Sequence, residues 1–151
     1  MSSVYEIIES SVSALRESHS LFVKNHEEAA TNKELMVLKP DWNRYLDIEA
    51  VGKLLVLVAY ADGAIVGYSL NVIDSNIHYA DLVVCNNTVL FVLPEHRASP
   101  LGLRLMKRTR EHAKAYGAAV VVWHAKEHSS LSKLLSRKRI KVEEIIYSEP
   151  L

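Results

Sequence analysis

The sequence predicts a mixed α/β domain with a mostly antiparallel central sheet and helices on both faces. Two apolar runs of strand length, residues 54–60 and 65–73, flank the pair Asp62-Gly63. Asp-Gly between such runs is the strongest short signal for a two-residue hairpin, because both turn residues need a positive φ. Farther along, an apolar run, an amphipathic helix pattern and another apolar run follow one another. That succession indicates two parallel strands joined by a helix.

The segment before the hairpin predicts a short strand and two helices. Residues 4–8 have the composition of an edge strand, and apolar side chains recur every three or four positions over residues 12–29. That spacing predicts one long amphipathic helix. Pro40 interrupts the chain, Asp41 is suited to cap a second helix, and Gly52 is suited to end it. The second helix is expected to turn Trp42, Tyr45, Leu46 and Val51 toward the core.

The segment after the hairpin predicts alternating strands and helices. Residues 82–93 form a long apolar run that the polar pair Asn86-Asn87 interrupts, so we expect a bulge near its middle. Residues 101–116 predict a helix with one apolar and one basic face. The remaining expected elements are a strand at 118–123, a short basic helix at 130–138 and a last strand at 142–147. The predicted order is therefore β-α-α-β-β-β-α-β-α-β.

The composition excludes several classes of protein. A chain of 151 residues is the size of one domain, so we expect residues 1–151 to form a single core without disulfides or structural metal. Eighteen Lys plus Arg balance eighteen Asp plus Glu, which argues against nucleic acid or a membrane as partner. The basic stretches at 104–110 and 137–139 are interpreted as solvated helix faces. The lone Cys85, the acidic N-terminal residues and the lack of a long apolar run favour a cytoplasmic protein.

The junction between residues 89–93 and the helix that begins at residue 101 is the segment where we expect the chemistry. A strand, a turn of small residues and a helix start follow one another directly. The N–H groups of a first helical turn and the positive end of the helix dipole form an anion site. Small side chains at Ala98, Ser99 and Gly102 let a phosphate approach the main chain. The same succession is also how α/β proteins connect a strand to a helix, so the pattern alone leaves both interpretations open.

The same residues resemble the coenzyme A motif of the GNAT superfamily, the GCN5-related N-acetyltransferases. That motif runs Arg or Gln, two residues, Gly, one residue, then Gly or Ala, and its positions fall here on Arg97, Pro100 and Gly102, after Val92 and Pro94. The predicted order of elements is also the GNAT order, so the resemblance covers nearly the whole chain and implies a GNAT-like sheet. Further details are similar to a branch of GNAT proteins common in bacteriophages, namely those at residues 26–28, 78–79, 123–124 and 144–147.

The resemblance implies acetyl-CoA as the cofactor and direct transfer of its acetyl group. Backbone N–H groups around Phe91 and Val92 would hold the thioester oxygen as charge develops on it. The pantetheine arm of the coenzyme would add itself between Val92 and the strand at residues 120–123. The coenzyme site that the resemblance implies comprises Phe91, Val92, Leu93, Arg97, Ala98, Ser99, Leu101, Gly102, Leu103 and Arg104.

Two residues depart from the family pattern. Pro100 stands where the family has its first loop glycine, and proline has no N–H to donate. If that amide meets a phosphate oxygen, its loss costs about 1.5–3 kcal/mol, which Arg97 or Arg104 can offset in part. Leu135 falls where many members place the tyrosine that protonates the leaving thiolate. The chain therefore needs another acid or none.

The candidate catalytic residues are Glu28 and His78 as bases, with Glu27 beside the first, and Tyr147 as a substitute acid at the end of the last strand. A base is useful because an alkylamine is mostly protonated at neutral pH. Each candidate also has an ordinary interpretation, as a solvated helix residue, a loop residue or a packed aromatic. The seven histidines lack the spacing of metal ligands, so we expect no metal site.

Two functions are compatible with the sequence. The first is an N-acetyltransferase that moves an acetyl group from acetyl-CoA to an amine of a small molecule or protein, in the host cytoplasm if it is encoded by a phage. The alternative is a catalytically weak or inactive GNAT-fold protein that binds a host protein partner, which Pro100 and Leu135 permit. A homodimer formed through the last strand is left open, and no motif identifies the acceptor.

Overall fold

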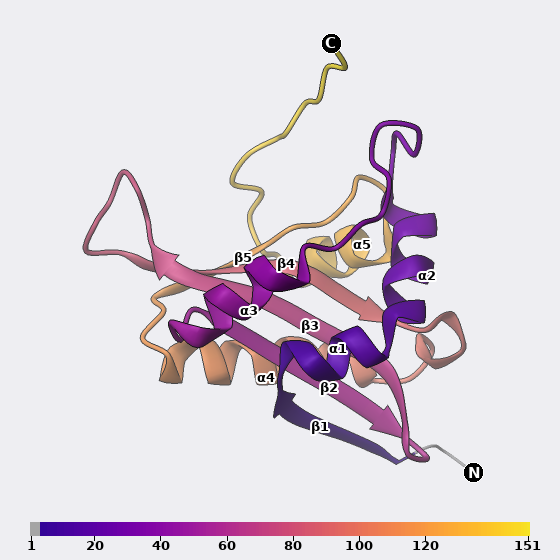
Figure 1. Ribbon diagram of the computed structural model, residues 1–151. Helices are drawn as coiled ribbons and strands as arrows, with labels where there is room; N and C mark the ends of the chain where they lie inside the picture. Colours follow the sequence, from indigo (N-terminus) through magenta and orange to yellow (C-terminus); the bar gives the residue numbers. More distant parts are fainter. Residues whose placement is uncertain (1–3) are drawn as a thin grey trace.

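Five strands form one sheet in the computed structural model, which describes residues 4–151 (Figure 1). The strand order is β1-β2-β3-β4-β5, and each of the first four strands is antiparallel to its neighbour, whereas β5 runs parallel to β4. The predicted mixed, mostly antiparallel sheet is therefore confirmed. The strands are β1 (Tyr5–Ser10), β2 (Leu54–Ala61), β3 (Ala64–Ser75), β4 (Val83–Val92) and β5 (Val120–Trp123).

Helices cover both faces of the sheet, so the domain has three layers (Figure 1). On one face, β2 and β3 pack against the helices that precede them, through residues such as Val58 and Tyr68. On the other face, β2 and β4 pack against α4 through Leu57, Cys85 and Leu105. Because β2 is buried on both faces, its sequence is apolar throughout rather than alternating. The helices are α1 (Val12–Glu17), α2 (His19–Ala29), α3 (Trp42–Ala50), α4 (Leu101–Ala115) and α5 (Ser130–Arg137), with a 3-10 turn η1 (Pro94–His96).

The hairpin between β2 and β3 has the predicted turn. Asp62 and Gly63 both adopt positive φ, 51° and 80°, and Ala61 pairs with Ala64 across them. Two consecutive residues in this conformation match a type I′ turn, whose twist suits the flanking strands. The prediction from the Asp-Gly pair is confirmed.

The predicted long helix over residues 12–29 is wrong, because Ser18 divides it into α1 and α2. Ser18 leaves the helical conformation at φ −102° and ψ 37°, and its N–H donates to Leu15 O at 3.0 Å. The change of direction lets Leu15 and Phe22 both pack on the same sheet face.

The second predicted helix is confirmed as α3, and Asp41 caps it by accepting a hydrogen bond from Arg44 N at 3.0 Å. Its inward residues were predicted only in part. Trp42 and Tyr45 pack against the core together with Ile48. Leu46 and Val51 are instead 39% and 67% exposed, because the buried side of this short helix repeats every three residues.

The predicted last strand at residues 142–147 is also wrong. Val142 and Ile146 are 81% and 72% exposed, and the segment forms no strand. Figure 1 shows the chain leaving the body after α5 and ending away from the sheet. Since a strand is stable only when its main chain pairs with a neighbour, a segment that runs away from the sheet stays irregular.

Candidate active site

The edge of β4 opens halfway along the strand. In the described residues, β4 pairs with β5 only from Val84 opposite Val120 to Asn87 opposite Trp123. His124 N still donates to Asn87 O at 3.3 Å, and beyond this contact the two chains separate. Residues 88–92 therefore present main-chain groups along an edge that β5 leaves uncovered.

A β-bulge at Thr88 lies where the two strands separate. On β3, Leu70 pairs with Val89 and Asn71 pairs with Asn87, so Thr88 is the extra residue. The predicted bulge in this strand is confirmed, one residue after the Asn86-Asn87 pair. A one-residue insertion moves the following side chains to the opposite face. Accordingly, Cys85 packs in the core beside α4, whereas Phe91 packs in the core beside α1 and α2.

The alternation of the ladder decides which amides face the open edge. Leu93 N donates to Val66 O at 2.9 Å, so these two residues form a hydrogen-bonded pair. In an antiparallel ladder, hydrogen-bonded pairs alternate along the strand with pairs that are not hydrogen-bonded. Phe91 therefore bonds to β3, while Leu90 and Val92 direct their N–H groups away from it. Of the two residues predicted to hold a thioester oxygen, Val92 has the expected orientation and Phe91 does not. The N–H of Leu93, another predicted coenzyme contact, is engaged within the sheet.

The segment where the turn enters α4, residues 98–103, retains three free amides. Arg97 N donates to Pro94 O at 3.2 Å, Ser99 N donates to His96 O at 3.3 Å, and Leu101 N lies 3.3 Å from Ser99 Oγ. The first helical bond is Arg104 N to Pro100 O at 3.0 Å. Among residues 4–151, no acceptor meets the other N–H groups of residues 98–103, which are those of Ala98, Gly102 and Leu103.

Gly102 leaves room for a ligand at this turn. Apart from its two chain neighbours and the backbone of its own helix, a Cβ placed on Gly102 would meet no atom of the described residues within 4 Å. The glycine stands in the first turn of α4, a helix of 15 residues, where the helix dipole is positive. Pro100 occupies the N-cap position and provides no amide, as expected from the sequence. The turn thus presents free amides at the positive end of a helix, with fewer donors than the family pattern contains.

Arg97 and Glu28 connect the end of β4 to α2. Arg97 Nη2 donates to both carboxylate oxygens of Glu28, at 2.9 and 2.7 Å, and Arg97 Nε donates to Val92 O at 2.8 Å. The guanidinium also lies 5.5 Å from the centre of the Phe91 ring. The predicted base Glu28 is therefore held by a cation beside the open edge. The Arg97 side chain is used for this contact rather than turned toward the free amides at the start of α4.

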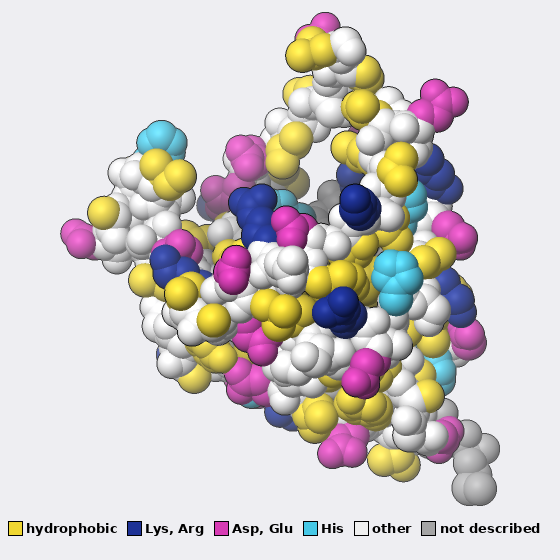
Figure 2. Space-filling model, viewed as in Figure 1, with side chains coloured by type: hydrophobic (Ala, Val, Ile, Leu, Met, Phe, Trp, Pro, Cys, Tyr) yellow, Lys and Arg dark blue, Asp and Glu magenta, His cyan; other side chains and the backbone are white. Residues whose placement is uncertain are grey.

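The other predicted catalytic residues lie elsewhere. His78 is exposed in the loop between β3 and β4, which stands out from the body as a lobe at the opposite end from α2 (Figure 2). Tyr147 is 88% exposed in the segment after α5, because the strand that would have placed it near the cleft is not formed. Glu28, His78 and Tyr147 therefore do not converge on one site, and Glu27 is exposed beside Glu28.

Sequence reasoning missed two contacts that hold the turn in place. Tyr5 on β1 bonds through its hydroxyl to His96 Nδ1 at 2.9 Å, and Arg104 Nη2 donates to Tyr5 O at 3.3 Å. These pairs are more than 90 residues apart in sequence, so no local pattern could have revealed them. They attach both ends of the turn to the first strand.

Tyr68 is the buried phenol nearest to this region. Its ring stacks on Phe22 at 5.1 Å and lies 5.9 Å from the Phe91 ring. Its hydroxyl has no partner within the described part of the chain. Burial raises the pKa of Tyr68 far above that of a free phenol, and nearby Tyr45 raises it further. Tyr68 therefore stays neutral at physiological pH.

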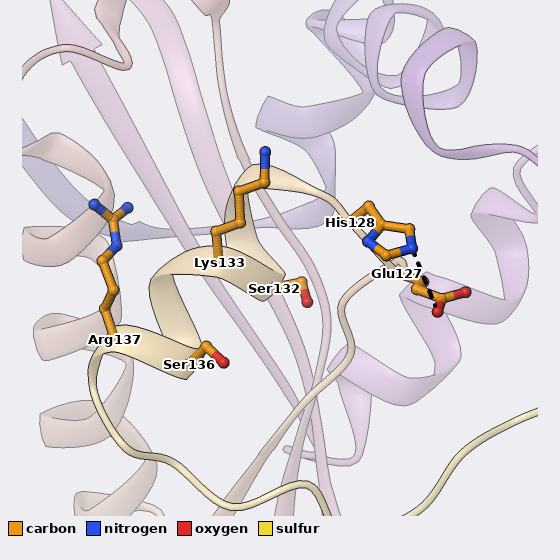
Figure 3. Close-up of a pocket in the computed structure, with 6 residues that line it drawn as sticks. All are labelled: Glu127, His128, Ser132, Lys133, Ser136 and Arg137. Atoms are coloured by element: carbon orange, nitrogen blue, oxygen red, sulfur yellow. Dashed lines mark ion pairs between the residues drawn. The ribbon is translucent and has the colours of Figure 1, made fainter.

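Two surface hollows accompany the site. One of about 230 Å³ adjoins the turn and is lined by Pro100, Leu103, Arg104, Met106, Lys107, Arg110 and Lys138. The other, of about 590 Å³, lies along α5 (Figure 3). Its only ion pair joins His128 and Glu127, both more than 85% exposed, and its side chains point in different directions. The first hollow includes Leu103 and Arg104 of the predicted coenzyme site, whereas the second contains none of the predicted site residues.

Within residues 4–151, no group of three or more His, Cys, Asp or Glu residues is placed to hold a metal ion. In the same part of the chain, no helix has the length and apolar character needed to cross a membrane.

The fold and the site combine a five-stranded mixed sheet, a helix start with free amides and a strand edge that is open beside it. The sequence model described as the Acetyltransferase (GNAT) family matches residues 14–132, and the chain belongs to this family. No curated protein matches the chain in sequence.

Solved structures with the same fold include several acetyltransferases. An aminoglycoside acetyltransferase, HMB0005, from an uncultured soil metagenomic sample has a TM-score of 0.75 at 17% identity, over 98% of this chain and 99% of that one. A ribosomal-protein-alanine N-acetyltransferase from Brucella melitensis biovar Abortus 2308 has a TM-score of 0.73 at 15% identity, with the same coverage. AAC(6′)-Iy in complex with the bisubstrate analogue CoA-S-monomethyl-acetylneamine has a TM-score of 0.70 at 18% identity, over 98% and 99% of the two chains. At these identities the likeness establishes the fold.

Proposed function

We propose that this protein is an N-acetyltransferase that takes the acetyl group from acetyl-CoA and transfers it directly to an amine. The observation that carries the proposal is the turn at the start of α4. Three amides that meet no acceptor within the described residues, those of Ala98, Gly102 and Leu103, lie at the positive end of a 15-residue helix, with open space at Gly102. A pyrophosphate is the ligand that such a turn fits. The basic hollow beside it, lined by Arg104 and Lys107, would take further negative charge of the coenzyme.

The open edge of β4 would hold the rest of the coenzyme. An extended pantetheine arm carries amide groups, which can bond to a strand edge as a further strand does. The N–H groups of Leu90 and Val92 are the donors available to the arm and to the thioester oxygen as it gains charge. This arrangement keeps Val92 in the predicted role and replaces Phe91 by Leu90.

Glu28 is the base that we propose for the acceptor amine. A carboxylate has about four lone-pair directions, and Arg97 uses one on each oxygen. The remaining lone pairs can accept a proton from the amine directly or through water, since the Glu28 side chain is 43% exposed. Arg97 would then fix the orientation of the base beside the strand edge. His78 and Tyr147 have no part in this proposal.

The acceptor that we propose is a primary amine. One neighbour in fold is described as an aminoglycoside acetyltransferase and another as a ribosomal-protein-alanine N-acetyltransferase, so the fold serves amines on molecules of very different size. A cytoplasmic location in a phage-infected host, and a homodimer formed by pairing of residues 142–147, also stay proposals. The buried free thiol of Cys85 is compatible with a reducing compartment.

A second candidate function has a specific observation in its favour. Pro100 removes one donor from the turn, and Arg97 N and Ser99 N are engaged within it. A protein with so few free amides can bind the coenzyme weakly and act by contacting a protein partner instead. Binding of the coenzyme therefore separates the two candidates.

The test is the melting temperature with and without acetyl-CoA. At one hundred times the Kd, a single-site ligand adds about 2.7 kcal/mol of stability, which raises the midpoint by about 5–10 °C for a domain of this size. The matched variant is Gly102→Asp, because a side chain at residue 102 enters open space and an acidic residue suits a first helical turn. We expect it to keep the unliganded midpoint and lose the shift. Absence of a shift in the natural protein with millimolar acetyl-CoA would instead favour the protein-binding function.

A further inference from the structure

A buried polar network joins the bulge of β4 to the helix that carries the turn. It consists of four side chains with no exposed surface: Ser69, Asn71, Asn87 and Thr109. They lie on the α4 face of strands that are otherwise apolar there. Polar residues at buried strand positions are the sequence signal that could have revealed this network.

The donors and acceptors of the network can be assigned. Ser69 Oγ accepts from Asn71 Nδ2 at 3.0 Å and from Asn87 Nδ2 at 3.1 Å, which uses both of its lone pairs. Its proton is then directed to Thr109 Oγ1, 2.8 Å away. Thr109 in turn donates to Leu105 O at 2.8 Å. The chain of bonds therefore runs in one direction, from β4 through β3 into α4.

Asn87 spans the bulge. Its Nδ2 lies 3.1 Å from Val89 O and 2.8 Å from Asn71 Oδ1, so the amide bridges the residues on either side of Thr88. The hydroxyl of Thr88 donates to Leu70 O at 3.1 Å and holds the bulge from the β3 side. Asn87 is also the last residue of β4 that pairs with β5.

The amide of Asn87 is used only as a donor. Three acceptors lie within reach of Nδ2, although it has two hydrogens, while Oδ1 is buried with no partner among residues 4–151. An unpartnered buried oxygen destabilises a fold, and an apolar residue would avoid it. The residue is therefore better suited to shaping the bulge than to stabilising the core.

The network also relates the two ends of the proposed site. Leu105 and Thr109 lie about one and two helical turns after Leu101 on α4. The same set of bonds thus holds the open edge that begins at the bulge and the helix whose first turn has the free amides. An extended ligand that contacts both ends needs this spacing to be constant.

We propose that Asn87 is a positioning residue that clamps the bulge at Thr88, and so sets the open edge of β4 at the spacing from α4 that the coenzyme requires. The inference rests on the proposed function for its role, but the clamp itself is a property of the unliganded protein. Asn87 contacts no substrate in this account and acts through the main chain of β4.

The test compares Asn87→Ala with Cys85→Ala. Cys85 is two residues earlier on β4, is buried in the core on the same sheet face and makes no hydrogen bond with the described residues of the network, so it controls for general loss of packing. The first measurement is amide hydrogen exchange of Val89 and Phe91 in the unliganded variants. Because these amides bond to β3 beside the bulge, we expect them to exchange about tenfold faster in Asn87→Ala than in the natural protein. In Cys85→Ala, we expect no change in their exchange beyond the change in the global stability of the variant.

The second measurement is the Kd for acetyl-CoA at a temperature where both variants are folded. We expect it to rise about tenfold in Asn87→Ala and to change by less than about twofold in Cys85→Ala. If Val89 and Phe91 exchange in Asn87→Ala at the same rate as in the natural protein, Asn87 does not clamp the bulge. If both variants lose affinity for acetyl-CoA equally, the clamp does not set the coenzyme site. Either result overturns the proposal. If the natural protein binds no acetyl-CoA, the proposed function fails, and the exchange comparison still decides whether Asn87 clamps the bulge.

Discussion

Arg97 and Glu28 lie 69 positions apart in the sequence, yet a single guanidinium nitrogen contacts both carboxylate oxygens. The pair connects the last turn of α2 to the turn that follows β4. Because Arg97 also bonds to Val92 O, the carboxylate is held next to the edge at which an acyl group would be presented. The relationship gives Glu28 a fixed position that its neighbour Glu27 lacks.

Replacing Glu28 by Gln should lower the rate of transfer while leaving coenzyme binding intact. A positioned general base contributes about 10²–10⁴-fold, so kcat for any amine that is turned over should fall by about that factor. The measurement is thiol release from acetyl-CoA over a panel of amines. Glu27→Gln is the matched control, because Glu27 is exposed on the same helix turn and should retain full activity. Equal activity of both variants would remove Glu28 from the mechanism.

Replacing Pro100 by Gly should strengthen the binding of acetyl-CoA. The substitution adds an N–H at the N-cap of α4, and a hydrogen bond to a charged group contributes about 1.5–3 kcal/mol, which corresponds to about 10–100-fold in Kd. Calorimetry measures the change. Pro40→Gly, in the loop before α3, controls for the added freedom of the unfolded chain and should leave the Kd unchanged. An unaltered Kd in Pro100→Gly would mean that the amide of residue 100 does not face the ligand.

Replacing Gly67 by Ala should destabilise the protein. A Cβ at this position would lie 2.9 Å from Phe91 O, so β3 and β4 would have to separate where the open edge is formed. Overpacking of this kind costs about 1–3 kcal/mol, and the melting midpoint should fall by about 3–10 °C. Gly102→Ala is the opposite case, since its side chain meets open space and alanine favours a helix by up to about 1 kcal/mol. A lower midpoint in Gly102→Ala than in Gly67→Ala would contradict the packing described here.

The thiol of Cys85 should be unreactive in the folded protein. Burial raises the pKa of Cys85 to about 11, so the thiolate is about 0.1% populated at pH 8. Because the folded state favours the protonated thiol, this group's contribution to stability is fully present below the ordinary pKa near 8.5 and is lost as pH rises through about 11. Labelling with a disulfide reagent should therefore require unfolding. The stability difference between the natural protein and Cys85→Ala should shrink above about pH 8.5. Rapid labelling at pH 8 without unfolding would show that the strand opens locally.

The sequence predicts well the parts of this fold that short segments determine by themselves. The Asp62-Gly63 turn, the Asp41 cap and the single apolar face of α4 each follow from a few adjacent residues, and the structure confirms them. The bulge was expected near Asn86-Asn87 because polar residues interrupt an apolar strand, and it lies one residue later.

The missing parts depend on contacts between distant segments. Whether residues 142–147 form a strand depends on a partner for their main chain, which their own composition does not supply. Which N–H groups face the open edge depends on the exact residue inserted in the bulge, so the sequence alone could not show that Leu90 and Val92 do so and Phe91 does not. In the same way, the contact of Arg97 with Glu28 cannot be read from either helix or loop alone.

The single inserted residue at Thr88 also constrains how this protein can change over evolutionary time. Residues before and after it alternate between the two buried faces of the sheet in opposite phase, so Cys85 and Val92 reach one layer and Phe91 the other. The identities of these side chains can vary within each layer. The number of residues cannot vary, because removing one would exchange the two faces for every residue up to Val92. Relatives of this chain should therefore tolerate many substitutions in this strand but very few changes in its length.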